Sequence, residues 1–581
     1  MTGRQSSSVR RAAAQKGWAR TLLLGIALGA SASSIAADQP APDKKLIEYG
    51  WDVPTPQQMR EQLTAMEKRP FDGLIFRLGG GHNAFVTQPL EAAKFAEDER
   101  ILRDLPFKQF ADNFVLVWGS PPAGFDWFDD AQWQAIEANA RLLVGVAQAG
   151  RPRGICFDPE PYDFSLWDYA KQPRAKDHSF ANYRAKVRQR GAQLMRTFED
   201  RMPGATILTF FHVSLFDRFA TLPEMARAER LQRESWGLMP DFSVGMLEGA
   251  TDKARFIDGN ENAYYYTSSE QYFRAYHAIR RRALGLVPPE LREKYERQVR
   301  AGQALYVDQN FALRQPDTEK YLSYRMTPEE RATWFEHNTY WALYTTDEFV
   351  WCYSERMNWW KNETPPGLEA AIVSARRKIA EGKPLGFDIE PLIEAAEKRN
   401  WISLFNGKDL TGWTVRGKAT WSVEDGVLVG VGGMGHIYTD AACSDFEAKG
   451  MFRITGQGAT ANSGFYFRAN PPADDASGFP RGYEAQICNT GDAYTGWLWK
   501  PGTPTGKANG LLTKDGEWFS YRIRAAGTNI QFWINDKPVM THSDPEYKTG
   551  RFAIQGHNPG MKIEAKELYY LDLAPVPAKR P

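Results

Sequence analysis

The hydrophobic pattern of the chain changes near residue 400 from helical to strand-like spacing, and it stays strand-like to about residue 573. Short runs of alternating apolar and polar residues are separated there by turns rich in glycine, asparagine and aspartate. This pattern predicts an all-β sandwich of two sheets. The runs that we expect to be strands are 446–454, 464–468, 483–488, 518–524, 529–534 and 551–555.

Before residue 400 the pattern alternates between strand-like and helical runs. Eight strands that alternate with eight helices over this length indicate a (β/α)8 TIM-type barrel. The expected strands are 46–53, 73–78, 114–118, 154–158, 206–211, 242–247, 304–308 and 349–353. The expected helices are 55–68, 92–104, 130–148, 180–201, 223–236, 269–300, 328–344 and 368–381. The prediction is a multidomain chain with a barrel at 45–385, a linker at 386–400 and a sandwich at 401–575.

Composition narrows the possible partners. A chain of 581 residues is too long for one hydrophobic core. Its formal net charge of +1 gives no reason to expect nucleic acid or an anionic membrane surface. Aromatic residues make up 13% of the chain, and aromatic rings pack in cores and also stack on sugar rings.

The first 36 residues predict a signal peptide. A basic segment precedes a short apolar stretch at 21–32, and Ser34-Ile35-Ala36 has the small-x-small form of a cleavage site. The apolar stretch is too short to span a bilayer, so we expect no stable membrane span after its removal. The expected location is periplasmic or secreted, with Sec and twin-arginine export both left open. The basic residues are Arg4, Arg10, Arg11, Lys16 and Arg20.

The four cysteines, Cys156, Cys352, Cys443 and Cys488, form no CxxC motif and no cluster with histidine. They therefore predict neither a structural zinc site nor a disulfide framework. No cofactor is required by the sequence. A divalent metal held by carboxylates with His212 or His557 is left open, although no ligand spacing demands it.

In a barrel of this kind the active site lies at the carboxyl ends of the strands. The fourth expected strand ends in Asp158-Pro159-Glu160, which resembles the strand-four motif of chitinase-type barrels without the longer acidic run of that family. Two carboxyl groups held close together raise one pKa, and glycoside cleavage uses such a pair. Asp158 and Glu160 are therefore candidate catalytic residues, with structural acids as the alternative.

Glu355, after the eighth expected strand, is a further candidate catalytic residue of the barrel. Other side chains at or near the expected strand ends are candidate substrate-binding residues. They are Arg77, Trp118, His212, Glu248 and Trp351.

Several motifs after residue 400 follow one another in a recognisable order. They are LFNGKDLTGW at 404–413, VEDGVL at 423–428, NSGFYFR at 462–468, GYEAQI at 482–487, GEW at 516–518, YRI at 521–523 and IQGH at 554–557. Together they resemble the 3-keto-disaccharide hydrolase family. The resemblance implies a concanavalin-like jelly roll and an activity on 3-keto-glycosides, by hydrolysis or by lyase and hydratase steps.

Alternation along the expected strands of this sandwich places a set of polar side chains on the face opposite the core. A base on that face would remove the acidic proton beside a sugar ketone, and a cation would stabilise the enolate. Glu484 and His557 are the candidate bases. The candidate substrate-binding residues are Tyr466, Arg468, Gln486 and Gln555.

The sequence thus predicts an exported carbohydrate-active enzyme, a glycoside hydrolase or 3-keto-disaccharide hydrolase, whose substrate is an oligosaccharide or keto-sugar. Two alternatives remain. The sandwich binds sugar without reacting and is attached to an active barrel, or the barrel is a non-catalytic scaffold.

Overall fold

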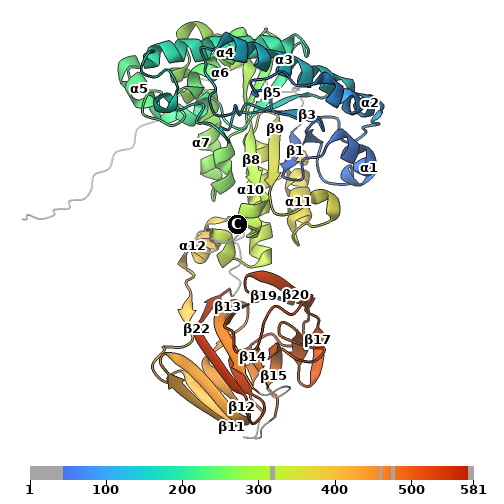
Figure 1. The fold of residues 1–581 in the computed structure, drawn as a ribbon, viewed down its shortest axis with the longest axis vertical. Helices are drawn as coiled ribbons and strands as arrows, with labels where there is room; N and C mark the ends of the chain where they lie inside the picture. Colours follow the sequence, from blue (N-terminus) through green and yellow to red (C-terminus); the bar gives the residue numbers. More distant parts are fainter. Residues whose placement is uncertain (1–43, 315–320, 457–460, 473–477, 574–581) are drawn as a thin grey trace, which may run out of the picture. The chain divides into compact units, whose positions relative to one another are not determined.

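A computed structural model of the chain describes residues 44–314, 321–456, 461–472 and 478–573 (Figure 1). The predicted signal peptide at 1–36 lies outside the described residues. Within the described residues no helix has the length and apolar character needed to cross a membrane.

Nine parallel strands form the sheet of the N-terminal part, in the order β7-β6-β5-β4-β3-β2-β1-β9-β8. Strands buried on both faces read as continuous apolar runs, as in β3 and β4. The strands are β1 (Lys45–Gly50), β2 (Gly73–Phe76), β3 (Phe114–Trp118), β4 (Gly154–Asp158), β5 (Thr206–Thr209), β6 (Arg255–Asp258), β7 (Val299–Ala301), β8 (Gln303–Tyr306) and β9 (Phe349–Ser354).

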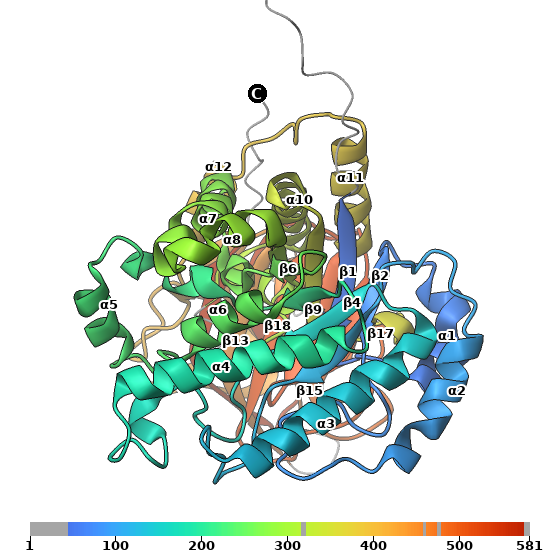
Figure 2. The same cartoon turned by 90° about the horizontal axis from the view of Figure 1, so that it is seen from above.

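Helices cover the outside of these strands, and Figure 2 shows α3 and α4 running side by side. Capping residues set several starts: Thr55 before α1 and Thr327 before α10 both form capping boxes. The helices are α1 (Pro56–Met66), α2 (Ala96–Asp104), α3 (Asp130–Ala147), α4 (Phe180–Glu199), α5 (Glu224–Leu231), α6 (Met239–Gly249), α7 (Ser269–Arg280), α8 (Arg292–Gln298), α9 (Val307–Phe311), α10 (Pro328–Thr345), α11 (Leu368–Ala380) and α12 (Glu390–Lys398). Short 3-10 helices include η4 (Val213–Phe219) and η5 (Glu261–Tyr265).

The predicted closed (β/α)8 TIM-type barrel is wrong in its strand count, because the described part of the sheet holds nine strands and is only nearly closed. Only Gly302 separates β7 from β8, but β7 pairs with β6 while β8 pairs with β9. Gly302 N donates to Asp258 O at 2.8 Å, and a Cβ at Gly302 would come 2.8 Å from the same oxygen. The chain therefore breaks its ladder where only glycine fits.

The expected strand at 242–247 lies inside helix α6, and the expected helix at 269–300 is broken into shorter elements. The sequence is misleading there because α6 is buried almost all round, so it lacks the polar face that marks a surface helix. Glycines let α6 pack closely on α4: a Cβ at Gly245 would lie 2.0 Å from Arg188 O.

The C-terminal part is antiparallel β structure, as expected, with its own hydrophobic core. Its main ladder runs β17-β16-β15-β14-β21-β12-β22-β13-β18-β19-β20, and β10 and β11 pair with β22 and β12. Asp425 and Gly426, both at positive φ, form the two-residue hairpin between β11 and β12. The strands are β10 (Ile402–Ser403), β11 (Trp413–Glu424), β12 (Val427–Cys443), β13 (Phe446–Thr455), β14 (Asn462–Asn470), β15 (Arg481–Cys488), β16 (Leu498–Lys500), β17 (Thr503–Gly506), β18 (Phe519–Ala526), β19 (Asn529–Ile534), β20 (Lys537–Ser543), β21 (Gly550–Gly556) and β22 (Lys562–Asp572).

Candidate functional site

Glu484 is a buried carboxyl group on β15, on the face of the sheet opposite the hydrophobic core. Its neighbours Tyr483 and Ala485 belong to that core, so alternation turns Glu484 away from it. The glycine of the NSGFYFR motif makes room for the carboxyl group, because a Cβ at Gly464 would come 2.3 Å from Glu484 Oε1. Glu484 is only 7% exposed. The position of this acid therefore depends on a glycine in the neighbouring strand.

A chain of hydrogen bonds leads to Glu484 from two neighbouring strands. Gln555 Nε2 on β21 donates to Tyr466 Oη on β14 at 3.1 Å, and the Tyr466 hydroxyl donates to the Glu484 carboxylate. Gln555 Nε2 also lies 3.4 Å from His436 Nε2 on β12. The His436 ring meets Tyr466 edge-on, with 5.2 Å between the ring centroids. Four polar side chains from four adjacent strands are thus packed together.

The electrostatics of this cluster favour a base that works near neutral pH. Burial raises the pKa of Glu484 to about 7, and the hydrogen bond from Tyr466 opposes that rise. Burial, and secondly His557, lower the pKa of His436 to about 3, so this imidazole is neutral. A carboxyl group with a pKa close to the working pH is well suited to take up and return a proton.

Several polar atoms in this region are buried without a hydrogen-bond partner among the described residues. They are Gln555 Oε1, Tyr438 Oη and Trp499 Nε1. Trp499 lies opposite Glu484 in the ladder between β15 and β16. Buried polar groups are nearly always hydrogen-bonded, so unpaired donors and acceptors beside an acid indicate places for ligand hydroxyl groups.

Two other sandwich residues predicted from the sequence, His557 and Gln486, do not take part in the hydrogen bonds around Glu484. His557 is close enough to His436 to affect its pKa, and its Nδ1 contacts Asn558 Oδ1. Gln486 is buried, and its Oε1 accepts a 3.1 Å hydrogen bond from Ile487 N. We therefore place His557 at the edge of the cluster and Gln486 in a local backbone contact.

Arg468 does not join the cluster, contrary to the prediction. Its guanidinium donates to Ser444 O at 2.6 Å, Gly527 O at 2.9 Å and Asp445 Oδ1 at 2.8 Å. The ladders on both sides of β14 shift register around this residue, and Arg468 has a φ of 47°. The bulge ends the simple alternation of the strand. The predicted role of Arg468 beside an enolate is therefore wrong, and this arginine ties loops together.

The barrel residues Asp158 and Glu160 do meet, through a tyrosine that the sequence analysis did not single out. Tyr162 Oη lies 2.8 Å from Asp158 Oδ2 and 2.7 Å from Glu160 Oε2. Burial, and then the neighbouring Glu160, raise the pKa of Asp158 to about 8, and burial also raises the pKa of Glu160. Asp158 ends β4, as expected, and the Asp-x-Glu spacing brings both carboxyl groups to one hydroxyl.

Two further acids belong to the same electrostatic group. Glu355 Oε1 accepts a 2.8 Å hydrogen bond from Tyr306 Oη. Burial, followed by Glu160, Asp158 and Glu355, raises the pKa of Glu261 to about 9. The four carboxyl groups therefore act on one another at the carboxyl edge of the sheet, although Glu261 in η5 was not predicted.

The remaining barrel predictions have mixed outcomes. The Trp118 ring lies 4.9 Å from the ring of Tyr162, next to the acids. Trp351 is in the core, where its Nε1 donates to Gly259 O at 2.8 Å and its ring stacks on Phe210. The sequence could not show which tryptophan lies beside the acids and which lies in the core. Trp118 ends an apolar strand, and Trp351 lies within one.

Three polar predictions of the barrel lie away from Asp158. Glu248 is exposed on α6 and pairs with Arg188 at 2.8 Å, because the strand that it was expected to end is a helix. His212 lines a separate internal cavity, and burial lowers its pKa to about 4. Arg77 follows β2 and acts on His82 and Asp98. Glu248 is therefore wrong as a substrate-binding residue, and neither His212 nor Arg77 reaches the acids.

The sequence analysis missed several residues of these two regions, which are His436, Tyr438, Trp499, Tyr162 and Glu261. For His436 the sequence did offer a signal, because this histidine lies within a glycine-rich strand, in the motif HIY at 436–438. In the described part of the chain no three or more His, Cys, Asp or Glu residues are grouped as metal ligands, and the four cysteines are buried and free.

Comparisons with known proteins bear on the C-terminal half. Residues 400–569 match the model of the 3-keto-alpha-glucoside-1,2-lyase-like domain family. The resemblance predicted for this half of the chain is confirmed. The match supports a carbohydrate-related function and does not extend to the barrel.

Solved structures also resemble part of the chain. A Parabacteroides distasonis protein described as a "putative glycosyl hydrolase" is 25% identical, with a TM-score of 0.25, over 31% of this chain and 96% of its own. The carbohydrate-binding module CBM66 from Bacillus subtilis is 19% identical, with a TM-score of 0.23, over 28% of this chain and 97% of its own. No curated protein matches the chain.

Proposed function

We propose that the C-terminal β domain cleaves 3-keto-glycosides by base-catalysed elimination, with Glu484 as the base. The observation that carries this proposal is the buried Glu484 carboxyl, whose pKa is raised to about 7 and which lies among polar groups of the face opposite the core. The family match of residues 400–569 supports the substrate class.

The reaction would begin at the carbon beside the ketone. A carbonyl at C3 makes the proton on C2 acidic, and the Glu484 carboxylate takes this proton. The C2–H electron pair then forms a double bond between C2 and C3, and the π pair of the carbonyl moves to the C3 oxygen. The resulting enolate expels the glycosidic oxygen from C1 and leaves a double bond between C1 and C2. The protonated Glu484 then gives its proton to the leaving oxygen. Addition of water across the double bond would complete a net hydrolysis.

Because Arg468 is committed elsewhere, other groups must stabilise the enolate oxygen. Tyr438 Oη and Trp499 Nε1 are buried donors with no partner among the described residues, and Trp499 lies opposite Glu484. Donors that are fixed before the reaction stabilise developing negative charge without reorganising. We assign these two side chains to the sugar oxygens, with neutral His436 holding Gln555 and Tyr466 in place.

The test is the release of a phenol from a 3-keto aryl glucoside by the full-length protein. Glu484→Gln keeps the size of the side chain and removes the base, and we expect kcat/KM to fall about 1,000-fold, since general base catalysis contributes 10²- to 10⁴-fold. Glu160→Gln in the barrel is the matched control and should leave this activity unchanged. The opposite result, loss with Glu160→Gln alone, would assign the cleavage to the barrel.

Sugar binding without reaction is the competing function for this domain. Retention of the 3-keto aryl glucoside by the wild-type protein with no phenol released would favour it over elimination. The unpartnered Gln555 Oε1 would then serve as a hydroxyl acceptor in a lectin-like site.

We also propose that the protein is exported, on the strength of the basic and apolar segments in residues 1–36. Cell fractionation of the full-length protein should recover it outside the cytoplasm with a new N-terminus near Ala37. A cytoplasmic product that retains Met1 would refute this.

A further inference from the structure

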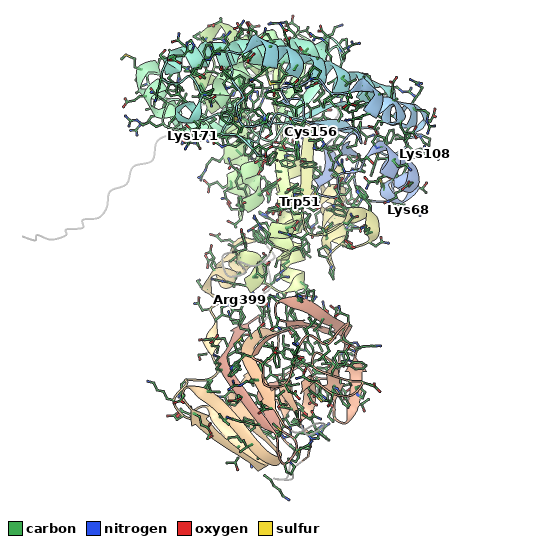
Figure 3. All side chains as sticks on the ribbon, in the orientation of Figure 1. Trp51, Lys68, Lys108, Cys156, Lys171 and Arg399 are labelled. Carbon is green, nitrogen blue, oxygen red and sulfur yellow. The ribbon has the colours of Figure 1, made fainter. Side chains whose placement is uncertain are left out.

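Exposed aromatic side chains border the acids of the barrel. Among the described residues, Trp51, labelled in Figure 3, follows β1. Trp51 is 67% exposed, while Tyr162 after β4 and Tyr265 after β6 are each 52% exposed. Trp51 is fixed, because its Nε1 donates to Tyr353 Oη at 2.9 Å and the Arg356 guanidinium lies 5.6 Å from its ring centroid. Ordered aromatic rings left in solvent are a surface on which the apolar face of a sugar can stack.

Buried tyrosines lie beneath this border. Tyr264 stacks on Tyr353 with 5.6 Å between ring centroids, and Tyr49 lies 5.4 Å from Tyr353. Tyr49 and Tyr264 are more than nine-tenths buried, and their hydroxyl groups make no hydrogen bond with any described residue. Both hydroxyl groups interact electrostatically with Glu160. Tyrosine hydroxyl groups that face acids and make no hydrogen bond with a described residue are available to a ligand rich in hydroxyl groups.

The contacts of Tyr162 require a proton on one of the carboxyl groups. A phenol has one hydrogen to donate, yet its oxygen lies within hydrogen-bond distance of both Asp158 and Glu160. If both carboxyl groups were ionised, one contact would place two acceptors together. A proton on Asp158 removes this conflict: Asp158 donates to Tyr162, and Tyr162 donates to Glu160.

We propose that the carboxyl edge of the barrel is a second active site, which hydrolyses ordinary, non-oxidised glycosides with Glu160 as the proton donor. Asp158 first passes its proton through Tyr162 to Glu160. Glu160 then gives this proton to the glycosidic oxygen, and the C1–O bond breaks with its electron pair on that oxygen. Water attacks C1 and passes a proton to the Glu355 carboxylate. The proton on Glu355 then returns through solvent to Asp158. The products are a free sugar and an alcohol.

This second site shares no residue with the Glu484 cluster, so the result of its test does not depend on whether Glu484 is a catalytic base. The test uses the full-length protein with dinitrophenyl, nitrophenyl and phenyl glucosides of both anomeric forms. A dinitrophenolate leaves without help, whereas a phenolate needs a proton. We expect Glu160→Gln to slow release of phenol about 100-fold and release of dinitrophenol far less. Glu91→Gln, on an exposed side chain, should change neither rate.

Two results would overturn the proposal. One is the absence of release from every glucoside of either anomeric form by the wild-type protein. The other is a Glu160→Gln variant that slows all leaving groups equally, which would mean that it disturbs the fold and not a proton donor.

Tyr162 is assigned a positioning role, and its test is a pH profile. Its hydrogen bonds lower the pKa of Asp158 and of Glu160, so Tyr162→Phe should move the basic limb of the profile, where Asp158 loses its proton, to higher pH. Tyr344→Phe, on the exposed side of α10, is the matched control and should leave the profile in place. If the pH profile of Tyr162→Phe does not shift, Tyr162 does not pass a proton between Asp158 and Glu160.

Discussion

Each half of the chain holds a buried carboxyl group against a tyrosine hydroxyl, but the two sheets place these groups in different ways. In the C-terminal half, Glu484 lies on the face of an antiparallel sheet, above Gly464 of the next strand. In the barrel, Asp158 lies at the carboxyl end of β4, and Glu160 follows in the loop. The first acid depends on strand register, and the second depends on where a strand ends.

The electrostatics differ for the same reason. Glu484 has amide, phenol and imidazole neighbours, and burial alone raises its pKa. Asp158 has a like-charged neighbour because Glu160 follows it by two residues in the same loop, so Glu160 adds to the effect of burial. A single acid on a face favours proton abstraction, whereas a group of acids at an edge favours storage and donation of a proton.

The comparison between the two acids assumes that Arg468 holds loops together and does not belong to the Glu484 cluster. Replacing Arg468 should therefore have the largest effect on the stability of the protein. Arg468→Met leaves Asp445 and three backbone carbonyl groups without their donor, so we expect a loss of about 3–5 kcal/mol in the free energy of unfolding. Urea unfolding measures this. Arg551→Met, whose ion pair with Asp440 spans 3.7 Å, should cost less than about 1 kcal/mol.

The dependence of Glu484 on register is tested by filling the space above Gly464. Gly464→Ala would force the carboxyl group aside, and we expect kcat/KM for a 3-keto aryl glucoside to fall about 100-fold, since small displacements of a catalytic group have effects of this size. Gly510→Ala, where an added Cβ meets nothing within 4 Å, is the control and should keep full activity. Equal activity in both variants would mean that Glu484 is not held by register.

The pH dependence distinguishes an acid that must be ionised from one that must be protonated. The 3-keto-glucoside activity should fall about tenfold for each pH unit below the Glu484 pKa of about 7, because only the carboxylate accepts a proton. Hydrolysis of ordinary glucosides should instead be lost as pH rises through about 8, where Asp158 gives up its proton. If both activities change with pH in the same direction, the two sites do not differ in whether their acid must be ionised or protonated.

The smallest effect concerns stability. The pKa of Asp158 is raised in the folded protein, so the stability that its protonated form contributes is complete below about pH 4 and is lost as pH rises through about 8. Asp158→Asn should therefore raise Tm by a few degrees at pH 9 and have less effect at pH 5, measured by thermal unfolding. Asp252→Asn, on an exposed side chain, should shift Tm equally little at both pH values.

The same difference between the halves explains which predictions from sequence succeeded. Alternation correctly assigned Tyr466, Glu484 and Gln555 to the face opposite the core, because the period of a strand survives wherever its ladder is regular. It failed at Arg468, because a bulge leaves no trace in hydrophobic alternation.

In the barrel, the prediction depended on strand boundaries. Asp158 was placed correctly because β4 ends at the proline of the Asp-Pro-Glu motif. Glu248 was misplaced because a fully buried helix and a buried strand have the same apolar composition. Glu261 could not be predicted, since its raised pKa arises from burial in the folded chain and then from acids on other loops.

The oxygen of Tyr162 lies between two carboxyl groups, and this has a consequence for how the protein responds to its surroundings. Shifting two hydrogens, one from Asp158 to Tyr162 and one from Tyr162 to Glu160, moves negative charge from Glu160 to the buried Asp158. A ligand that brings positive charge to Glu160 would draw that charge outward. The barrel can thus register the arrival of a cationic group by redistributing hydrogens, at a cost set by burial and without any movement of the backbone.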